Sequence, residues 1–264
     1  MSDVAHKDLA PERQAHLREI IRERGAVRVD ELCAETGVSP ATVRRDLEIL
    51  ESEGKIKRVH GGAVNVGQLL EEPLFDDKTG IASEEKKAIA QEASKLILDT
   101  DTDYLDGGST VLELAKLLKN RTKLTVVTNS LRAASELSYG GPRLILIGGE
   151  LRRRSQTIIG TLSRGTLDRI HLDKAFMGTM GITIDKGLTT TDPSEAFTKE
   201  LVMSRSEQVI LLADSVKVGQ VSFARAGVIK NIDIFVTDSR LDDSFERRLE
   251  KEDVRVVKAT IKSK

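Results

Sequence analysis

The sequence predicts an α/β protein of two domains, a winged helix-turn-helix at the N-terminus and a larger Rossmann-like domain with a mostly parallel sheet. Two observations predict this fold class. Up to residue 65, amphipathic helices are followed by a short alternating ribbon that ends in a glycine turn. From residue 83, short apolar runs alternate with helices, as in a covered parallel sheet. We therefore place the domains at residues 10–65 and 83–258, with a linker at 66–82.

The composition is that of a soluble chain. It has 264 residues, 39% of them hydrophobic and 31% charged, and a formal net charge of −1. A near-neutral chain has no global attraction to nucleic acid, so a DNA-binding surface must come from local clusters of basic residues. Cys33 is the only cysteine, which excludes an intramolecular disulfide and fits a reducing cytoplasm. No stretch approaches the roughly 20 apolar residues of a membrane span, and no signal-peptide core is present, so we expect a cytoplasmic protein.

Two helices precede the central motif. Apolar residues at helical spacing predict a first helix from Pro11, which Gly25 ends. The run "AVRV" reads as a short extended link. Asp30 is placed to cap a helix of about two turns, which Gly37 closes. Together with the next helix, these elements form a helix-turn-helix motif over about residues 27–46.

The stretch "SPATVRRDLEILESEGKIKRVHGG" contains the strongest local signals. The Ser39 hydroxyl can accept a bond from an orphaned backbone N–H, and Pro40 suits the first helical position. Val43, Leu47 and Leu50 recur at helical spacing and give the helix one apolar face.

The polar residues of the same stretch indicate a nucleic-acid surface. Thr42, Arg44 and Arg45 lie in the opening turns and point partly away from the apolar face. Gly54 lies where a left-handed C-cap is expected, and "KIKRVHGG" then alternates basic and apolar residues as a β-ribbon does. A helix with a basic leading edge, followed by a basic ribbon, favours DNA binding with this helix in the major groove.

The segment from "ERQAHLREII" through "VSPATVRRDL" to "GKIKRVHGGAV" resembles the N-terminal domain of the DeoR family of bacterial transcription regulators. The resemblance implies that Ser39–Leu50 is the recognition helix and that the ribbon supplies phosphate or minor-groove contacts. The implied DNA-binding residues are Ser39, Pro40, Thr42, Arg44, Arg45, Lys57, Arg58 and His60.

Two alternatives remain open for these residues. Arg44 and Arg45 can instead form a solvated helix face paired with Asp46 or Glu48, and His60 can have a purely structural role in the turn.

The second domain begins with a helix, "SEEKKAIAQEASKLI", that Ser83 is placed to cap. The strand candidates that follow are "DYLD", "LTVVT", "RLILIGG", "KAFMG", "QVILLAD" and "IDIFVTD". Ligands of open α/β sheets collect at the carboxyl ends of strands. The glycines and hydroxyls of "DGGST", at a strand end before a helix, suit an anion such as phosphate, although an ordinary strand-to-helix turn explains them equally well.

The strings "DGGST", "TNS", "IGGELR", "FMGTMGI", "GLTTTDPSEAFTKELV" and "ADSVKVG" occur in the order typical of the DeoR C-terminal sensor domain. That domain is similar in fold to ribose-phosphate isomerase, glucosamine-6-phosphate deaminase and coenzyme A transferases, and its usual effectors are phosphorylated sugars. Glu195 is the glutamate typical of its stretch and can meet a ligand hydroxyl or favour the start of a helix. The implied effector-binding residues are Asp106, Gly107, Gly108, Ser109, Thr110, Asn129, Ser130, Gly148, Gly149, Arg152, Glu195 and Lys217.

We therefore expect a DNA-binding transcriptional regulator, a repressor of a sugar or polyol catabolic operon that a phosphorylated sugar or related metabolite relieves. The expected partners are an operator duplex, the effector and further copies of the chain in a dimer or tetramer. A sugar-phosphate isomerase carrying a DNA-binding domain is the alternative, and a ligand-free architectural protein is a second one. No acid–base pair has a spacing that demands catalysis and no cluster has metal-ligand spacing, so we expect no cofactor and no metal.

Overall fold

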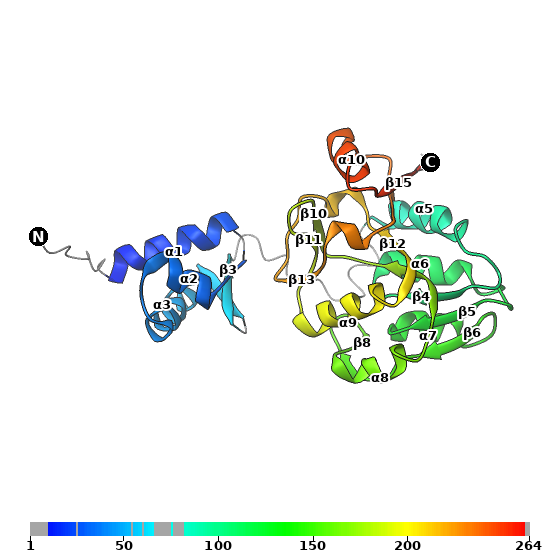
Figure 1. Ribbon diagram of the computed structural model, residues 1–264, viewed down its shortest axis with the longest axis horizontal. Coiled ribbons are helices and arrows are strands. Elements are labelled where there is room, and N and C mark those ends of the chain that lie inside the picture. The colour runs from blue at the N-terminus through cyan, green and yellow to red at the C-terminus, as the bar shows by residue number, and fades with distance from the viewer. Residues whose placement is uncertain are drawn as a thin grey trace, which may run out of the picture. The chain divides into compact units, whose positions relative to one another are not determined.

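The computed structural model of the chain describes residues 10–24, 26–53, 55–59, 61–65, 75 and 82–261. Gly54, His60 and nearly all of the expected linker lie outside them. The chain divides into two compact units, Met1–Glu71 and Glu72–Lys264, here called the winged unit and the α/β unit. Both appear in Figure 1. Among the described residues, no helix combines the length and apolar character needed to cross a bilayer.

The described residues of the winged unit form three helices and a three-stranded antiparallel sheet with strand order β1-β3-β2. The run expected to be an extended link is strand β1 of this sheet, because its three residues pair with β3. The elements are α1 (Ala10–Arg24), β1 (Ala26–Arg28), α2 (Val29–Thr36), α3 (Pro40–Ser52), β2 (Ile56–Val59) and β3 (Gly62–Asn65).

Local chemistry sets the turn between α2 and α3. Gly37 ends α2 in the left-handed conformation, with φ of 66°. Ser39 caps α3 through a hydrogen bond from a backbone N–H to its hydroxyl, and Pro40 occupies the first helical position, as predicted. Asp30 was expected to cap α2, and that prediction is wrong. The helix begins at Val29, two residues before the expected start at Glu31, so Asp30 lies in its first turn.

The three helices are held by an apolar core and one buried ion pair. The core consists of Leu17, Ile20, Ile21, Val27, Leu32, Val43, Leu47, Leu50, Ile56 and Ala63. Beside it, Asp46 of α3 accepts two hydrogen bonds from Arg13 of α1, at 2.7 and 3.2 Å, and one from Gln14 at 3.0 Å. The Asp46 side chain is only 4% exposed. This carboxylate therefore fixes α3 against α1.

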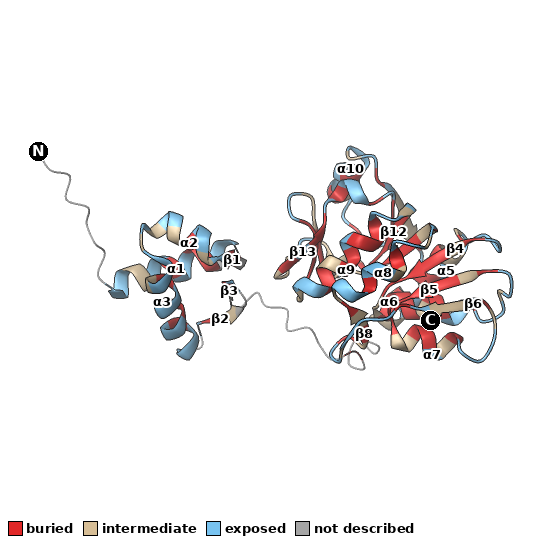
Figure 2. Cartoon of the chain, turned by 60° about the horizontal axis from the view of Figure 1, so that its bottom comes forward, coloured by how far each residue is buried: buried red, intermediate tan, exposed pale blue. Residues whose placement is uncertain are grey.

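The α/β unit is built on a seven-stranded sheet with order β15-β14-β12-β9-β4-β5-β6, in which every neighbouring pair is parallel. Most of its central strands are buried (Figure 2). The strands are β4 (Thr102–Leu105), β5 (Thr125–Thr128), β6 (Arg143–Leu146), β9 (Leu172–Met177), β12 (Ser206–Leu212), β14 (Ile234–Asp238) and β15 (Arg255–Ala259). The edge strand β15 was not among the strand candidates.

Helices cover both faces of the sheet. One core includes residues of α5, α6 and α7, and the opposite core includes residues of α8, α9 and α10. The helices are α5 (Ser83–Ser94), α6 (Ser109–Leu117), α7 (Leu131–Leu137), α8 (Arg164–Leu167), α9 (Pro193–Met203) and α10 (Asp243–Glu250). The predicted cap on α5 is wrong: Ser83 is the first helical residue, and Ala82 precedes it with φ of 51° and no side-chain cap.

Two smaller sheets complete the unit, and the pattern of strands and helices did not predict either of them. One is antiparallel, with order β10-β11-β13, from β10 (Gly181–Thr183), β11 (Gly187–Thr190) and β13 (Ala224–Gly227). The other is the hairpin of β7 (Glu150–Arg152) and β8 (Thr157–Ile159). Short 3-10 turns are η1 (Thr161–Ser163), η2 (Ser215–Lys217) and η3 (Ile229–Asn231).

Asp103 is a buried carboxyl group in the central strand β4. It is 0% exposed, and neither of its oxygens has a hydrogen-bond partner within the described chain. The pKa of Asp103 is raised to about 8, first by burial and then by the neighbouring Asp101 carboxylate, while Lys174 opposes the rise. The folded protein therefore holds this group in its neutral form at pH 7.

Asp103 should make the α/β unit less stable as pH rises from about 4 to about 8, because the unfolded carboxyl ionises near its ordinary pKa while the folded one stays protonated. The loss is on the order of 1.4 kcal/mol for each unit of pKa shift. Asp103→Asn should flatten this slope in urea unfolding followed by tyrosine fluorescence. Both tyrosines, Tyr104 and Tyr139, lie in this unit, and the chain has no tryptophan. An unchanged slope would refute the assignment.

Asp46→Ala should lower the free energy of unfolding of the winged unit by about 3 kcal/mol, because it leaves the Arg13 guanidinium without its buried partner. Amide hydrogen exchange in α1 and α3 measures the effect. Glu35→Ala is the matched control: it breaks the exposed pair with Arg24 and should cost less than about 1 kcal/mol. Equal losses in the two variants would contradict the positional role of Asp46.

Candidate functional site

The N-terminal half of α3 presents two arginines to solvent. Arg44 and Arg45 are exposed, and neither makes an ion pair with any residue that the structure describes. Thr42, in the first turn, is half-buried and shares a 3.0 Å hydrogen bond with the Ser39 hydroxyl. The predicted contact residues of this helix therefore lie together at its start, with two uncompensated positive charges.

The carboxylates of α3 are engaged elsewhere. Asp46 is bound by Arg13 and Gln14, and Glu48 forms a 2.7 Å ion pair with Arg58 of strand β2. The open alternative, in which Asp46 or Glu48 neutralises Arg44 and Arg45, is therefore not what the structure contains.

The wing is tied to α3 by Arg58. Its guanidinium pairs with Glu48, and its backbone N–H donates to a Glu51 carboxylate oxygen at 2.8 Å. Arg58 was predicted to contact DNA, and in the free protein its side chain already has a carboxylate partner. Lys57 lies in β2, and His60 falls outside the described residues.

A cavity of about 110 Å³ lies at the carboxyl ends of three adjacent strands, β4, β9 and β12. Because these strands are parallel neighbours, the loops that follow them meet at one edge of the sheet. Helix α9 and the β7–β8 hairpin supply the other walls. The polar lining residues are Lys86, Gly107, Gly108, Ser109, Thr110, Ser155, Thr157, Gly178, Thr179, Glu195, Lys199, Asp214 and Lys217. The apolar ones are Phe75, Val111, Met180, Leu212, Ala213 and Val216.

The loop after β4 delivers the start of α6 to this cavity. Gly107 is required there because a Cβ would overlap the Thr157 methyl group of the hairpin, and Gly108 has φ of 142°. Ser109 and Thr110 open the helix, so their hydroxyls lie beside backbone N–H groups that lack intrahelical partners. A helix start of this kind can bind an anion.

Asp106 lies behind the cavity lining and is bonded to two of the lining residues, Lys199 and Gly178. Its carboxylate contacts the Lys199 ammonium directly and accepts a 3.0 Å hydrogen bond from the backbone N–H of Gly178. Lys199 in turn donates to the Gly178 carbonyl at 3.0 Å. Asp106 and Lys199 are 2% and 4% exposed. The pair joins the loops after β4 and β9 to α9.

Glu195 lies one helical turn before Lys199 on α9. Its carboxylate is 3.7 Å from the Lys199 ammonium and 3.4 Å from the Arg152 guanidinium. Arg152 also approaches Asp192 at 3.4 Å and donates to the Thr191 hydroxyl at 3.1 Å. Arg152 therefore braces the β7–β8 hairpin against the start of α9, and it does not line the cavity itself.

The loop after β12 places Asp214 beside two lysines. Burial raises the pKa of Asp214, while the positive charges of Lys217 and Lys86 oppose the rise. Lys86 is buried, at 6% exposure, and comes from α5. Lys217 is half-buried in η2, and it forms no ion pair within the described part of the chain.

The structure therefore divides the predicted effector residues into two groups. Six of them line the cavity, and Asp106 is bonded directly to cavity residues: the six are Gly107, Gly108, Ser109, Thr110, Glu195 and Lys217. Five do not line it: Asn129, Ser130, Gly148, Gly149 and Arg152. Instead, Asn129 donates to the Ile158 carbonyl at 3.2 Å, Ser130 caps α7, and Gly149 packs on Ile158. Asn129 and Gly149 thus contact the hairpin that forms a wall of the cavity.

Sequence reasoning missed several lining residues. Lys199 lies in the quoted string "SEAFTKELV", and one signal could have identified it: it stands four residues after Glu195, on the same face of a helix. Lys86 lies in the first turns of α5 among other charged residues, so nothing in the sequence distinguished it from a surface lysine. Ser155 and Thr157 lie in a hairpin that was not predicted.

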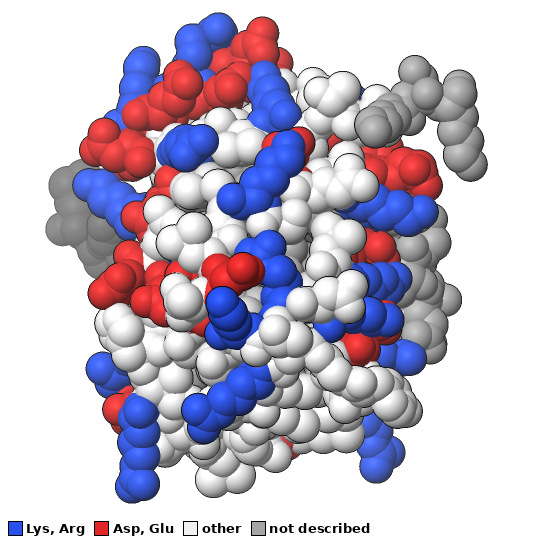
Figure 3. Space-filling model, turned by 90° about the vertical axis from the view of Figure 1, so that its right-hand side faces the viewer, with Lys and Arg blue, Asp and Glu red and all other residues white. Residues whose placement is uncertain are grey.

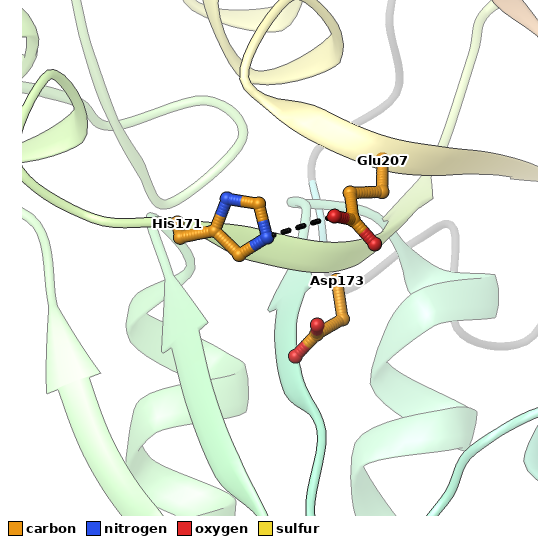
Figure 4. Close-up of side chains that lie close together, drawn as sticks. All are labelled: His171, Asp173 and Glu207. Atoms are coloured by element: carbon orange, nitrogen blue, oxygen red, sulfur yellow. Dashed lines mark hydrogen bonds and ion pairs between the residues drawn. The ribbon is translucent and has the colours of Figure 1, made fainter.

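A second group of titratable side chains, His171, Asp173 and Glu207, meets on strand β9 and at the start of β12. Their ligand atoms lie within 4.8 Å of one another. Figure 4 shows the His171 ring directed at the Glu207 carboxylate, with Asp173 turned away. The His171–Glu207 distance is 3.1 Å, both side chains are exposed, and Asp173 accepts the Thr102 N–H at 2.7 Å. The group is therefore explained by two structural contacts: an exposed His171–Glu207 pair and the hydrogen bond from Thr102 at the start of β4 to Asp173.

The surface charge of the described residues is mixed. On the face shown in Figure 3, basic and acidic side chains are interspersed with uncharged surface. This pattern agrees with the near-zero net charge of the chain.

Two family descriptions match the chain. The "DeoR-like helix-turn-helix domain" matches residues 13–68, and the "DeoR C terminal sensor domain" matches residues 81–239. Solved structures of ribose 5-phosphate isomerase are similar over about half of the chain. For the protein of Methanocaldococcus jannaschii, identity is 21%, coverage is 50% of this chain and 53% of that one, and the TM-score is 0.38.

Curated relatives match over most of their own length. The HTH-type transcriptional regulator GlpR of Haloferax volcanii is 35% identical over 94% of this chain and 98% of its own. The HTH-type transcriptional regulator IolR of Bacillus subtilis is 34% identical over 87% and 91%. The lactose phosphotransferase system repressor of Streptococcus mutans is 34% identical over 89% and 95%. These relatives are regulators and not enzymes, so the chain is a DNA-binding transcriptional regulator, and it belongs to the DeoR family.

Proposed function

We propose that this regulator represses a sugar or polyol catabolic operon and that a phosphorylated sugar or related metabolite, bound in the cavity of the α/β unit, relieves the repression. The main support for effector binding in the α/β unit is the lining of the cavity. It combines the start of α6, two hydroxyls, and lysines from three elements at one edge of a parallel sheet. Those groups suit a phosphate, and the neighbouring carboxylates suit sugar hydroxyls.

The names of relatives support the choice of operon. One is a lactose phosphotransferase system repressor, and another, from Escherichia coli O157:H7, is a putative aga operon transcriptional repressor, 30% identical over 93% of this chain. The lone Cys33 fits our proposal that the protein acts in the cytoplasm.

The DNA-binding half rests on α3 and the wing. Arg44 and Arg45, exposed and uncompensated, are the proposed contacts of the recognition helix, with Ser39, Pro40 and Thr42 at its start. One module of this size contacts few phosphates, so we propose that two or more copies of the chain bind repeated or palindromic half-sites.

Effector binding must then favour one arrangement of the oligomer over another. The ligand shifts the population only as far as it prefers the arrangement whose DNA-binding units no longer match the half-site spacing. The contacts of Asp106, Gly178 and Lys199 link three walls of the cavity, so a ligand there can act on several elements of the α/β unit at once.

A broad panel of phosphorylated sugars and polyols should contain at least one compound that raises the melting temperature of the α/β unit, because a ligand that binds only the folded state stabilises it. At a ligand concentration 100 times Kd, the stabilisation is about 2.7 kcal/mol. Inorganic phosphate is the weak-binding reference. A panel with no shift would refute the effector proposal, and turnover of any aldose or ketose phosphate would favour the isomerase alternative.

Arg44→Ala should weaken binding to a duplex selected from a randomised pool by the wild-type chain, and it should leave the effector-induced melting shift unchanged. If Arg44 contacts one phosphate, the slope of log K against log salt should fall by about 0.9. Arg247→Ala, the same loss of charge on exposed α10, is the control and should change neither quantity. Normal DNA binding by Arg44→Ala would contradict the proposal that α3 is the recognition helix and contacts DNA through Arg44.

Lys217→Ala should have the opposite effect. It should bind the selected duplex as the wild type does, but it should lose most of the melting shift and no longer release DNA when the effector is added. The physical reason is the loss of a cavity lysine without a carboxylate partner in the described chain. Lys230→Ala, an exposed lysine outside the cavity, should respond normally. A full response by Lys217→Ala would exclude Lys217 from the site.

A further inference from the structure

We propose that the cavity selects an effector with one phosphate group and an otherwise neutral, hydroxyl-bearing body, and that it rejects phosphorylated sugar acids and bisphosphates. This inference rests on the proposed function and goes beyond it, because it fixes which phosphorylated metabolites the site accepts.

The charges available to a phosphate are confined to one part of the lining. The α6 start contributes Ser109 and Thr110 with their backbone N–H groups, and the half-buried Lys217 has no carboxylate bonded to it in the described chain. Lys217 comes from the loop after β12 and lines the same cavity as the start of α6. One phosphate can be neutralised there.

The cations on the α9 side are already used by the protein. The Lys199 ammonium is held by Asp106, by the Gly178 carbonyl and, at 3.7 Å, by Glu195. The Arg152 guanidinium behind Glu195 is held by Asp192, by Glu195 itself and by the Thr191 hydroxyl. A second anion of the ligand would therefore have to break one of these buried contacts to obtain a cation.

The same region contains a carboxylate that would repel a second anion. Glu195 lines the cavity and is only 8% exposed, so solvent screens its charge weakly, whereas Asp106 lies behind the lining in direct contact with Lys199. A ligand hydroxyl meets no such repulsion, because it can donate a hydrogen bond to a carboxylate or accept one from the Ser155–Thr157 hydroxyl pair, which uses only one of its two protons internally. The wall thus attracts hydroxyls and opposes carboxylates.

The cavity spans the ends of three adjacent strands. Strands β4 and β12 flank β9, so their ends lie about 10 Å apart at the usual strand spacing. That distance accommodates a phosphate and a short polyol chain side by side along the strand ends.

Matched pairs of compounds test the proposal by isothermal titration of the full chain. The pairs are glycerol 3-phosphate with 3-phosphoglycerate, glucose 6-phosphate with 6-phosphogluconate, and fructose 6-phosphate with fructose 1,6-bisphosphate. In each pair for which binding is measured, we expect the member with a single phosphate and no carboxylate to bind at least about tenfold more tightly, the factor of a charge repulsion of 1.4 kcal/mol.

The variant Glu195→Gln tests whether α9 causes the preference for ligands without a second negative charge. Glu195→Gln keeps the shape of the side chain but removes its charge, and it leaves Arg152 and Lys199 with one carboxylate fewer. The affinity ratio within each pair should shrink, because the acidic member gains relative to the neutral one. Glu207→Gln, an exposed carboxylate paired with His171 outside the cavity, is the control and should leave the ratio unchanged.

The outcomes separate this inference from the proposed function. Tighter or equal binding of the acidic member in the best-binding pair would overturn the inference while leaving a phosphorylated effector in place. An unchanged ratio in Glu195→Gln would overturn the role of the α9 wall. If no phosphate ester binds at all, including those of the wider melting panel, the proposed function fails and this inference fails with it.

Discussion

The buried contact between Asp106 and Lys199 is the interaction on which the α/β unit's cavity depends. It joins the loop after β4 to α9, and the Gly178 backbone, bonded to both side chains, adds the loop after β9. An ion pair this deeply buried is costly unless further hydrogen bonds satisfy its members, and Gly178 supplies them. The pair therefore fixes the relative positions of three walls and, at the same time, neutralises the cation that a second ligand charge would need.

The winged unit uses its acidic residues in a comparable way. Of the carboxylates on α3, Asp46 fixes the helix to α1, and Glu48 and Glu51 hold the wing through Arg58. Because these negative charges are engaged within the unit, Arg44 and Arg45 keep their positive charge for DNA phosphates or bases. Although the net charge of the whole chain is close to zero, the start of α3 is basic, because the acidic side chains of this helix are bound by other residues of the unit.

How far the sequence could predict this molecule depends on how local each signal is. Gly37, Ser39 and Pro40 act through bonds to their immediate neighbours, so the turn before α3 was predicted correctly. Alternating apolar runs predicted the central strands for the same reason. The antiparallel sheet of β10, β11 and β13 was not predicted, because its strands are only three or four residues long and β13 pairs with β11 across a long sequence separation.

The same distinction between local and long-range signals applies to the residues of the cavity. The "DGGST" loop is a local strand-to-helix turn and does line the cavity, whereas the glycines at 148 and 149 lie beside the β7–β8 hairpin. Lys86, Lys199 and Thr157 reach the cavity only because helices and a hairpin pack over the strand ends, which no single stretch of sequence reveals. Capping was also predicted too simply: Ser83 and Asp30 have the right side chains, but both lie inside their helices.

Hydrogen–deuterium exchange of the full chain, with and without the effector that the melting panel identifies, tests the central claim most directly. We expect slower exchange at the loops after β4, β9 and β12 and at the start of α9, because the ligand would contact or order those backbone amides. Protection confined to another part of the α/β unit, such as the strand starts near His171 and Glu207, would contradict it.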